Sequence, residues 1–516
     1  MFPIIPFLLA CRSPEEETDD QLWGRFKQWA FEDNAYWQDP QLIQDKYEMM
    51  GENIYKFMRG TASWYSLEKK RLSLDRLETS FLNEPDAQLI SVIGDAHIGN
   101  IGATLVTESG ALECPLNREE SVQEIDLNYQ DLDGTEWGPW LHDLERGALS
   151  LSLMFYLMEQ KAEERTTKGQ SSPPTFTEPE QGVIIDAYVR GYMDAFEYFS
   201  IEDGGEDLTL VSTEDVPDPS LDEAFWGKLM WKKEVEDALQ DFENYYDEDE
   251  KFNEMTDIDA EGNYVIAKDT WETFSMGTSQ EVTVALEPEE LITVEELFEK
   301  WKAEDPKGKR DGFVLEDGAR RYGDGVASIP AKRWYLLINP GLGGQRFILE
   351  VREVKPLGRP EFASEEERME SGKTNLWDAH NHDGCAAVLE SDEGRTYKAL
   401  SLDPAYRGLK PDDIYEEEYL EGDVDVDRMI DFAGSAGFTL GASHARGSVY
   451  GQNAGSAIEA ILADWKFVSE NQEEVYGILA GEINRAASAD LEALIRLYGI
   501  YQERQPKDPL LGSDDL

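Results

Sequence analysis

The residues best suited to chemistry lie in one short string, GDAHIGN, at positions 94–100. The string leaves an apolar, strand-like run at 89–93 and places Asp95 five residues before Asn100. This spacing on a loop after a strand is typical of phosphotransferases, in which the Asp accepts the proton of the substrate hydroxyl and the Asn oxygen binds a divalent cation. We therefore predict Asp95 as a general base and Asn100 as a metal ligand.

A second acidic string, DLNYQDLDG, stands about thirty residues later, at 126–134. An antiparallel turn between two strand-like runs would return this string to the side of Asn100. Mg²⁺ prefers hard oxygen ligands and usually takes one or two protein carboxylates alongside substrate phosphates. We predict Asp131 as a Mg²⁺ ligand and Asp133 as a second ligand or a neighbour. The alternative is that these acids only cap turns.

Helices and a small sheet are needed to position the two strings. Apolar residues at helical spacing predict helices, and alternating or short apolar runs predict strands. The stretch at 140–158 is apolar almost all round, so we expect a central buried helix there. The other expected elements are helices within 20–77, 182–199 and 426–516, and strands at 89–93, 101–106, 125–132, 333–338 and 346–354.

Four strings together resemble the signature of one bacterial family. They are RGTASWYSLE at 59–68, GDAHIGN at 94–100, IDLNYQDLDGTEWGPWLHDLER at 125–146 and SAGFTLGASHARG at 435–447. The chain resembles the family called domain of unknown function 2252, which is grouped by sequence with the protein-kinase-like phosphotransferases. The resemblance implies an α+β, two-lobed, kinase-like fold. It supplies no substrate.

The resemblance also implies roles for individual residues. Asp95 matches the catalytic-loop Asp, and Asn100 and Asp131 match the metal ligands. Asp143 matches the acid that braces the catalytic loop from the central helix. The phosphate-binding half comes later in the chain than the catalytic loop, so the resemblance implies that the lobes are circularly permuted.

The phosphate-binding half departs from the family pattern. Gly325 and Ser328 lie where the family has a glycine-rich loop, and Arg352 lies at the position of its strand lysine. Ala327 and Pro330 replace glycines of that loop, which restricts backbone approach to a phosphate and removes one N–H donor. Arginine can bind phosphate in a bidentate manner, but it differs from lysine in size and geometry.

Further basic residues are candidates for the site. Arg59 is a candidate phosphate contact because aromatic neighbours would hold its side chain still. His444 and Arg446 belong to the late family motif, and either they reach the substrate or phosphate or they serve helix packing. His97 lies inside the catalytic loop, where it either supports the loop through hydrogen bonds or takes part in catalysis.

The charge of the chain excludes several partners. The 516 residues include 47 Lys and Arg against 108 Asp and Glu, which gives a formal net charge of −61. Such a surface repels nucleic acid and anionic membrane surfaces. Hydrophobic residues make up 41% of the chain and aromatic residues 11%, which is enough apolar area to build cores and excludes a disordered acidic tail.

The cysteines give one clue about the compartment. Cys11 ends the apolar start MFPIIPFLLAC, and the chain resembles a bacterial lipoprotein lipobox there, in which the cysteine is acylated. The apolar run is short and lacks basic residues, so the sequence leaves open a lipid-anchored, extracytoplasmic protein and a cytoplasmic one. Cys11, Cys114 and Cys385 are too few and too scattered for a disulfide framework or a cysteine-based zinc site.

We divide the chain into five parts. These are a signal and tether at 1–20, a catalytic-loop lobe at 21–200, an acidic insertion at 201–320, a small β-rich nucleotide lobe at 321–410 and a helical part at 411–516.

The leading interpretation is Mg²⁺-dependent phosphoryl transfer from ATP or another nucleotide to an unknown small-molecule or protein acceptor. A catalytically impaired, pseudokinase-like binding or scaffold lipoprotein is the alternative that the altered glycine loop and Arg352 favour. A metallophosphoesterase, suggested by GDAH, is disfavoured because five histidines leave too few ligands for two metals.

Overall fold

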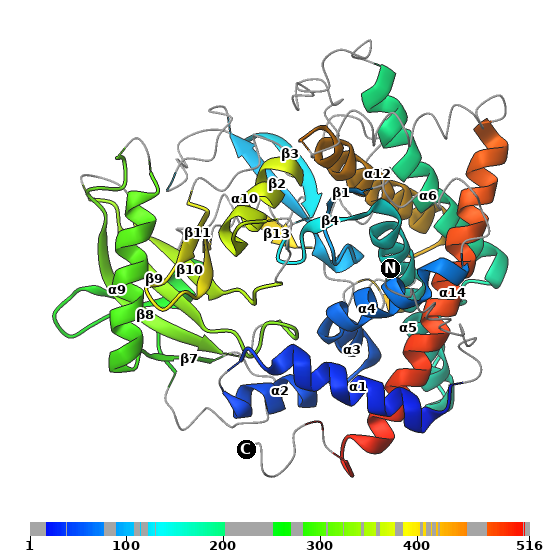
Figure 1. Ribbon diagram of the computed structural model, residues 1–516, viewed down its shortest axis with the longest axis horizontal. Helices are drawn as coiled ribbons and strands as arrows, with labels where there is room; N and C mark the ends of the chain where they lie inside the picture. Colours follow the sequence, from blue (N-terminus) through cyan, green and yellow to red (C-terminus); the bar gives the residue numbers. More distant parts are fainter. Residues whose placement is uncertain are drawn as a thin grey trace, which may run out of the picture.

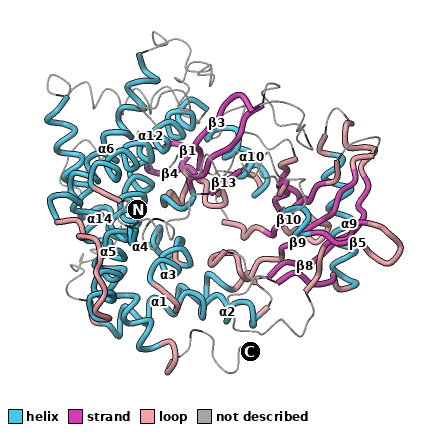
Figure 2. The backbone as a smooth tube through the Cα atoms, turned by 180° about the vertical axis from the view of Figure 1, so that it is seen from behind, coloured by secondary structure: helices cyan, strands magenta, loops and turns pink. Residues whose placement is uncertain are grey.

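The computed structural model contains a helical half and a sheet half, with small sheets between them (Figures 1 and 2). This arrangement confirms the α+β part of the predicted fold class. No helix in the described part of the chain is long and apolar enough to cross a membrane. The structure describes residues 17–37, 39–76, 89–107, 114, 122–129, 131–201, 251–269, 282–305, 308–322, 325–341, 345–357, 362–376, 385–402, 406–408, 414, 419–421, 424–450, 472–508 and 510.

The helical half is built around α5 (Trp140–Thr167), which is buried along most of its first 19 residues, 140–158, as the sequence predicted. Helix α12 (Val426–Tyr450) packs on α6 (Glu178–Ile201), and the two backbones approach closely at glycines. A Cβ atom at Gly437 would lie 1.9 Å from the carbonyl oxygen of Tyr188, so only glycine fits there. The remaining long helices of this half are α1 (Asp19–Asn34), α2 (Pro40–Met50), α3 (Ile54–Gly60), α4 (Ala62–Arg76) and α14 (Gln472–Arg504).

Two small sheets carry the strings predicted to do chemistry. Strand β1 (Leu89–Val92) pairs with β4 (Glu136–Pro139), and β2 (Ile101–Thr107) lies between β3 (Val122–Tyr129) and β13 (Tyr406–Gly408). The short 3₁₀ helix η3 (Ile98–Asn100) leads directly into β2. Strands β2 and β3 are antiparallel, with Ile101 opposite Tyr129. The predicted antiparallel return is therefore confirmed, and it brings the end of β3 back beside Asn100.

The sheet half is a six-stranded antiparallel sheet in the order β11-β12-β10-β9-β8-β7. Helix α9 (Pro288–Ala303) covers one face and contributes Val294, Leu297 and Trp301 to a core with the sheet. The described part of the segment predicted as an acidic insertion contributes α9, β7 and most of β8 to this half. The strands are β7 (Val282–Ala285), β8 (Val314–Tyr322), β9 (Arg333–Asn339), β10 (Phe347–Glu353), β11 (Ala387–Glu390) and β12 (Thr396–Ser401).

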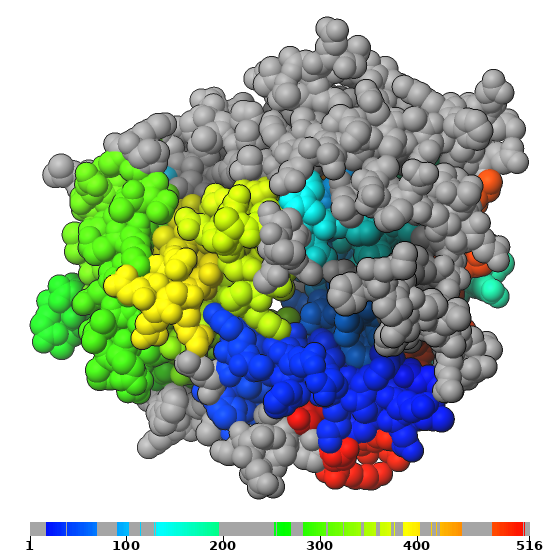
Figure 3. All heavy atoms as spheres, viewed as in Figure 1, coloured from blue at the N-terminus to red at the C-terminus, as the bar shows by residue number. Residues whose placement is uncertain are grey.

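Helix α10 (Glu365–Leu376) and a disulfide are two of the connections to the sheet half. Helix α10 contacts β1, β11 and α12, and the fully buried Arg368 donates from Nη1 to the carbonyl oxygen of Thr135 at 2.7 Å. A disulfide joins Cys114, in the connection between β2 and β3, to Cys385, just before β11. It is a single cross-link rather than a framework. The surface is hollowed between the sheet half, in green and yellow, and the N-terminal helices, in blue (Figure 3).

Candidate functional site

The 94–100 loop is held at its start by Asp143, a residue in the first turn of α5. This carboxylate is 2% exposed and accepts hydrogen bonds from the backbone N–H groups of Ile93 at 2.6 Å and Gly94 at 3.0 Å. Nε2 of His444, on α12, lies 3.0 Å from Asp143 Oδ2, and Nδ1 of His444 lies 2.9 Å from the Tyr192 hydroxyl. Asp143 thus makes the contact expected of a bracing acid, and His444 supports Asp143.

Glycine brings the two predicted strings into contact. Gly94 has φ +83°, and a Cβ atom there would lie 2.0 Å from the carbonyl oxygen of Gly134. The backbone of the 94–100 loop therefore touches the turn that follows Asp131 and Asp133. A side chain at position 94 would force the two segments apart.

Asp95 is held by an arginine that the sequence analysis missed. Arg146, 2% exposed, donates from Nε to Asp95 Oδ1 at 2.8 Å and from Nη2 to the carbonyl oxygen of Met58 at 3.1 Å. Its guanidinium also lies 4.8 Å from the centre of the Tyr65 ring. Arg146 follows Asp143 by three residues on α5, and this i, i+3 spacing of an acid and a base on one helix face was the available signal.

His97 and Asn100 are the other two polar side chains of the 94–100 loop. His97 is buried, with Nε2 3.8 Å from Asp95 Oδ2. Burial lowers the pKa of His97 to about 4, against an opposing effect of Asp95, so its ring is neutral near pH 7. Asn100 donates from Nδ2 to the backbone carbonyl oxygen of Asp95 at 2.9 Å. Because Nδ2 donates this hydrogen bond, the orientation of the Asn100 amide, and so of Oδ1, is fixed. No described residue donates a hydrogen bond to Oδ1.

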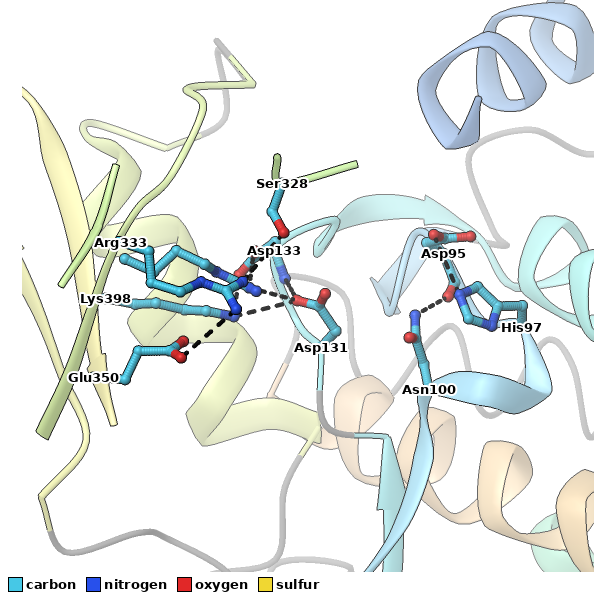
Figure 4. A network of polar contacts seen from close by, with 10 residues as sticks. Asp95, His97, Asn100, Asp131, Asp133, Ser328, Arg333, Glu350 and Lys398 are labelled. Atoms are coloured by element: carbon cyan, nitrogen blue, oxygen red, sulfur yellow. Dashed lines mark hydrogen bonds and ion pairs between the residues drawn. The ribbon is translucent and has the colours of Figure 1, made fainter. Parts of the chain in front are cut away.

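Asp131 and Asp133 face two cations of the sheet half (Figure 4). Asp133 pairs with Arg352 Nη2 at 2.6 Å and with Lys398 Nζ at 2.7 Å. Asp131 lies 3.5 Å and 3.3 Å from the same two nitrogen atoms. Burial alone would raise the pKa of Asp131, but Lys398 and Arg352 hold it well below its usual range.

Three cations stand side by side on one face of the sheet. Arg352 on β10 is opposite Lys398 on β12 and opposite Arg333 on β9. Arg333 donates from Nη2 to Ser328 Oγ at 3.2 Å and lies 3.8 Å from Glu350. Lys398 was missed by the sequence analysis, and the only signal was a lysine within the otherwise buried strand β12.

The segment predicted as a glycine-rich loop is a turn between β8 and β9. Gly325 has φ +71°, and the side chains of Val326 and Ile329 are buried in a core with the N-terminal helices. Ser328 faces Arg333, as described above. The turn is thus anchored at two points by apolar packing.

Other predicted residues are placed as follows. Arg59, at the end of α3, has its guanidinium 6.0 Å from the centre of the Tyr55 ring. Arg446 belongs to α12, but its side chain lies outside the described part of the structure, and Cys11 lies outside the described residues.

The predicted metal ligands do not form a closed cluster in the described structure. Within the described residues, no group of three or more His, Cys, Asp or Glu side chains is arranged to hold a metal ion. Asp131 lies near enough to His97 for its charge to act on the His97 pKa. Figure 4 shows Asp131 between the sheet cations and Asn100. The donor set of two carboxylates and one amide oxygen suits a hard divalent cation.

These features define an α+β protein with a mixed acidic and basic site between a helical half and an antiparallel sheet. Residues 38–375, more than half of the chain, match the model of the family described as "Uncharacterized protein conserved in bacteria (DUF2252)". The chain belongs to this family. No curated protein and no solved structure matches the chain.

Proposed function

We propose that this protein is a Mg²⁺-dependent phosphotransferase that moves a phosphoryl group from a nucleotide to an acceptor hydroxyl. The observation that carries the proposal is the pairing of Asp131 and Asp133 with Arg352 and Lys398 beside the loop of Asp95 and Asn100. Carboxylates that bind a cation and bases that bind phosphate are here within contact of each other.

The order of the sheet half supports this proposal. In protein kinases a glycine-rich loop covers the phosphates, and the phosphate-binding lysine lies on the third strand, before a helix that contributes a glutamate. When β8 is counted as the first strand, the turn around Ser328 joins the first strand to the second, β9. Arg352 lies on the third strand, β10, and α10 follows it. Because these elements come after the 94–100 loop in the chain, we propose a circularly permuted kinase-like fold.

In this proposal the four charged side chains exchange partners when the ligand binds. Without a ligand, Asp131 and Asp133 neutralise Arg352 and Lys398. Asn100, Asp131 and Asp133 would hold Mg²⁺, which neutralises the charge of the transferred phosphoryl group. Arg352 and Lys398 would then bind the nucleotide phosphates, as arginine and lysine commonly do.

Asp95 would act as the base in this scheme. It lies at the site with a side chain that is 21% exposed, so an acceptor hydroxyl can reach it. Arg146 fixes the carboxylate by bonding Oδ1, which leaves Oδ2 to accept a proton. The neutral ring of His97 fills the space beside it.

Calorimetric titration of the full chain with ATP, with and without Mg²⁺, tests the proposal. We expect saturable binding that requires Mg²⁺, and we expect Asp131→Asn to weaken it about tenfold or more. Asp259→Asn, in an exposed turn far along the chain, is the matched control and should leave the affinity unchanged. Absence of binding at millimolar nucleotide would contradict the proposal.

A second candidate is a kinase-like protein that binds a ligand without turnover, in a lipid-anchored form. The Cys114–Cys385 disulfide favours it, since disulfides persist mainly in oxidising compartments, where nucleotide triphosphates are scarce. Release of ADP from Mg-ATP by the full chain, lost in Asp95→Asn, would support the transferase. Binding with no ADP release under any condition would support the second candidate.

A further inference from the structure

Arg59 lies on the helical side of the site, away from the sheet cations. Its guanidinium carbon is 6.0 Å from the centre of the Tyr55 ring, which is buried, and that ring is 6.3 Å from the ring of His97. His97 in turn lies 3.8 Å from Asp95. Arg59 is therefore connected to the proposed base through the rings of Tyr55 and His97, and its charge contributes to the lowered pKa of His97.

Arg59 has no acidic partner among the described residues. The chain has 108 acidic side chains against 47 basic ones, and several of its arginines pair with carboxylates. Arginines of the same structure that do pair with carboxylates include Arg25, Arg320, Arg346, Arg368, Arg496 and Arg504.

No negative charge near the proposed base, among the described residues, is left to neutralise Arg59. Asp95 is already neutralised by Arg146, and the ring of His97 is neutral near pH 7. The cations of the sheet half are matched by Asp131 and Asp133. Arg59 is half-buried, and its guanidinium lies 6.0 Å from the centre of the Tyr55 ring, so its charge is available to a ligand.

We propose that Arg59 forms an oxyanion subsite beside Asp95, and that the subsite holds a phosphoryl or carboxylate group. This inference rests on the proposed function and names the acceptor class: a hydroxyl compound that carries its own anionic group. The same oxyanion chemistry could come from a second source, the terminal phosphoryl group of the nucleotide. Guanidinium groups bind either oxyanion with two parallel hydrogen bonds.

Titration of inorganic phosphate into the full chain saturated with Mg-ADP tests the subsite, with the heat of binding as the readout. Phosphate should bind at one saturable site. Arg59→Gln should weaken this binding about tenfold or more, whereas Arg59→Lys should keep part of it. Arg165→Gln is the matched control, because Arg165 lies at the far end of α5 and donates to the carbonyl oxygen of Ser171. It should bind phosphate as the unmodified chain does.

The same variants identify the source of the oxyanion. If Arg59→Gln removes the advantage of Mg-ATP over Mg-ADP in affinity, the subsite holds the terminal phosphoryl group. If that advantage stays and only phosphate binding falls, the acceptor supplies the group. Equal phosphate binding by Arg59→Gln and the unmodified chain, or no saturable binding at all, would overturn the subsite.

Failure of the subsite is separable from failure of the proposed function. If Mg-ADP does not bind, the phosphotransferase proposal fails, and phosphate is then titrated into the ligand-free chain. Loss of that binding in Arg59→Gln, with Lys398→Met unaffected, would still support an oxyanion subsite at Arg59. Loss in Lys398→Met alone would place the anion on the sheet half and overturn it.

Discussion

The helical and sheet sides of the candidate site hold their carboxylates by different means. On the helical side, Asp143 is 2% exposed and accepts two backbone hydrogen bonds, with His444 as a third partner. On the sheet side, Asp131 and Asp133 have side chains that are 43% and 29% exposed, and their ion-pair partners are the side chains of Arg352 and Lys398. Asp143 is thus held by backbone N–H groups, whereas Asp131 and Asp133 are held by charged side chains.

In the proposed function this difference corresponds to two roles: the helical side positions Asp95, and the sheet side binds the ligands. A buried acid with backbone partners is costly to disturb, because its loss leaves buried N–H groups without acceptors. A partly exposed ion pair is weak, so a ligand can replace one partner at small cost. In the proposed function, the helical side would therefore keep Asp95 in one place, while the sheet side would open for a cation and phosphates.

The largest expected effect is on the helical side, from Asp143→Ala. This change leaves the N–H groups of Ile93 and Gly94 and the ring of His444 without their acceptor. We expect it to lower the free energy of unfolding by about 3–5 kcal/mol, measured by urea denaturation of the full chain. Asp133→Ala on the sheet side should cost only about 1 kcal/mol.

Asp143→Asn is the control for this comparison. The asparagine side chain has the same shape as aspartate and keeps one acceptor oxygen, so this variant should recover part of the stability lost in Asp143→Ala. Equal losses from Asp143→Ala and Asp133→Ala would remove the distinction between the two sides.

The pH dependence of stability should also differ between the sides. The pKa of His97 is lowered from 6.5 to about 4 in the folded protein, so between these values the unfolded chain binds a proton that the folded chain does not. The stabilisation is present above pH 6.5 and is lost as pH falls toward 4, by about 1.4 kcal/mol per unit and about 3 kcal/mol in all. The pKa of Asp131 is lowered from 3.8, so its contribution is lost only below that pH.

His97→Gln isolates the helical contribution. The decline in the free energy of unfolding between pH 6.5 and 4 should become shallower by about 3 kcal/mol in this variant. Measurement at pH 8, where His97 is neutral in both states, gives the packing cost of the substitution alone. An unchanged slope in His97→Gln would show that other groups cause the acid loss.

Local spacing predicted that Asp95, Asn100 and the end of the third strand-like run lie near one another on the helical side. Asp95 and Asn100 lie on one short loop, and the antiparallel return of β3 follows from two adjacent strand-like runs. The bracing role of Asp143 came from the family resemblance, and the structure shows the hydrogen bonds. Arg146 was missed because its i, i+3 spacing from Asp143 places both residues on one helix face but does not show that Arg146 contacts Asp95.

The sheet side depends on contacts between residues far apart in sequence. Lys398 is separated from Asp133 by 265 residues, and only the strand order β12-β10-β9 places it beside Arg352. Residue pattern cannot fix that order. The conformation of the predicted glycine-rich loop is a second feature that the sequence could not predict. Val326 and Ile329 anchor this turn through apolar packing with helices from the other end of the chain.

The smallest expected effect concerns the ion pair between Lys398 and Asp133 itself. A double-mutant cycle with Lys398→Met and Asp133→Asn should give a coupling of about 1 kcal/mol in the free energy of unfolding, because Asp133 is partly exposed. Raising the salt concentration should reduce it further. The same cycle for Arg146→Met and Asp95→Asn should give a larger coupling with less salt dependence, because the Arg146 side chain is 3% exposed. A sheet coupling that matched the helical one at high salt would mean that the acids and cations of the sheet side are locked together, and their exchange for a metal and phosphates would then lose its physical basis.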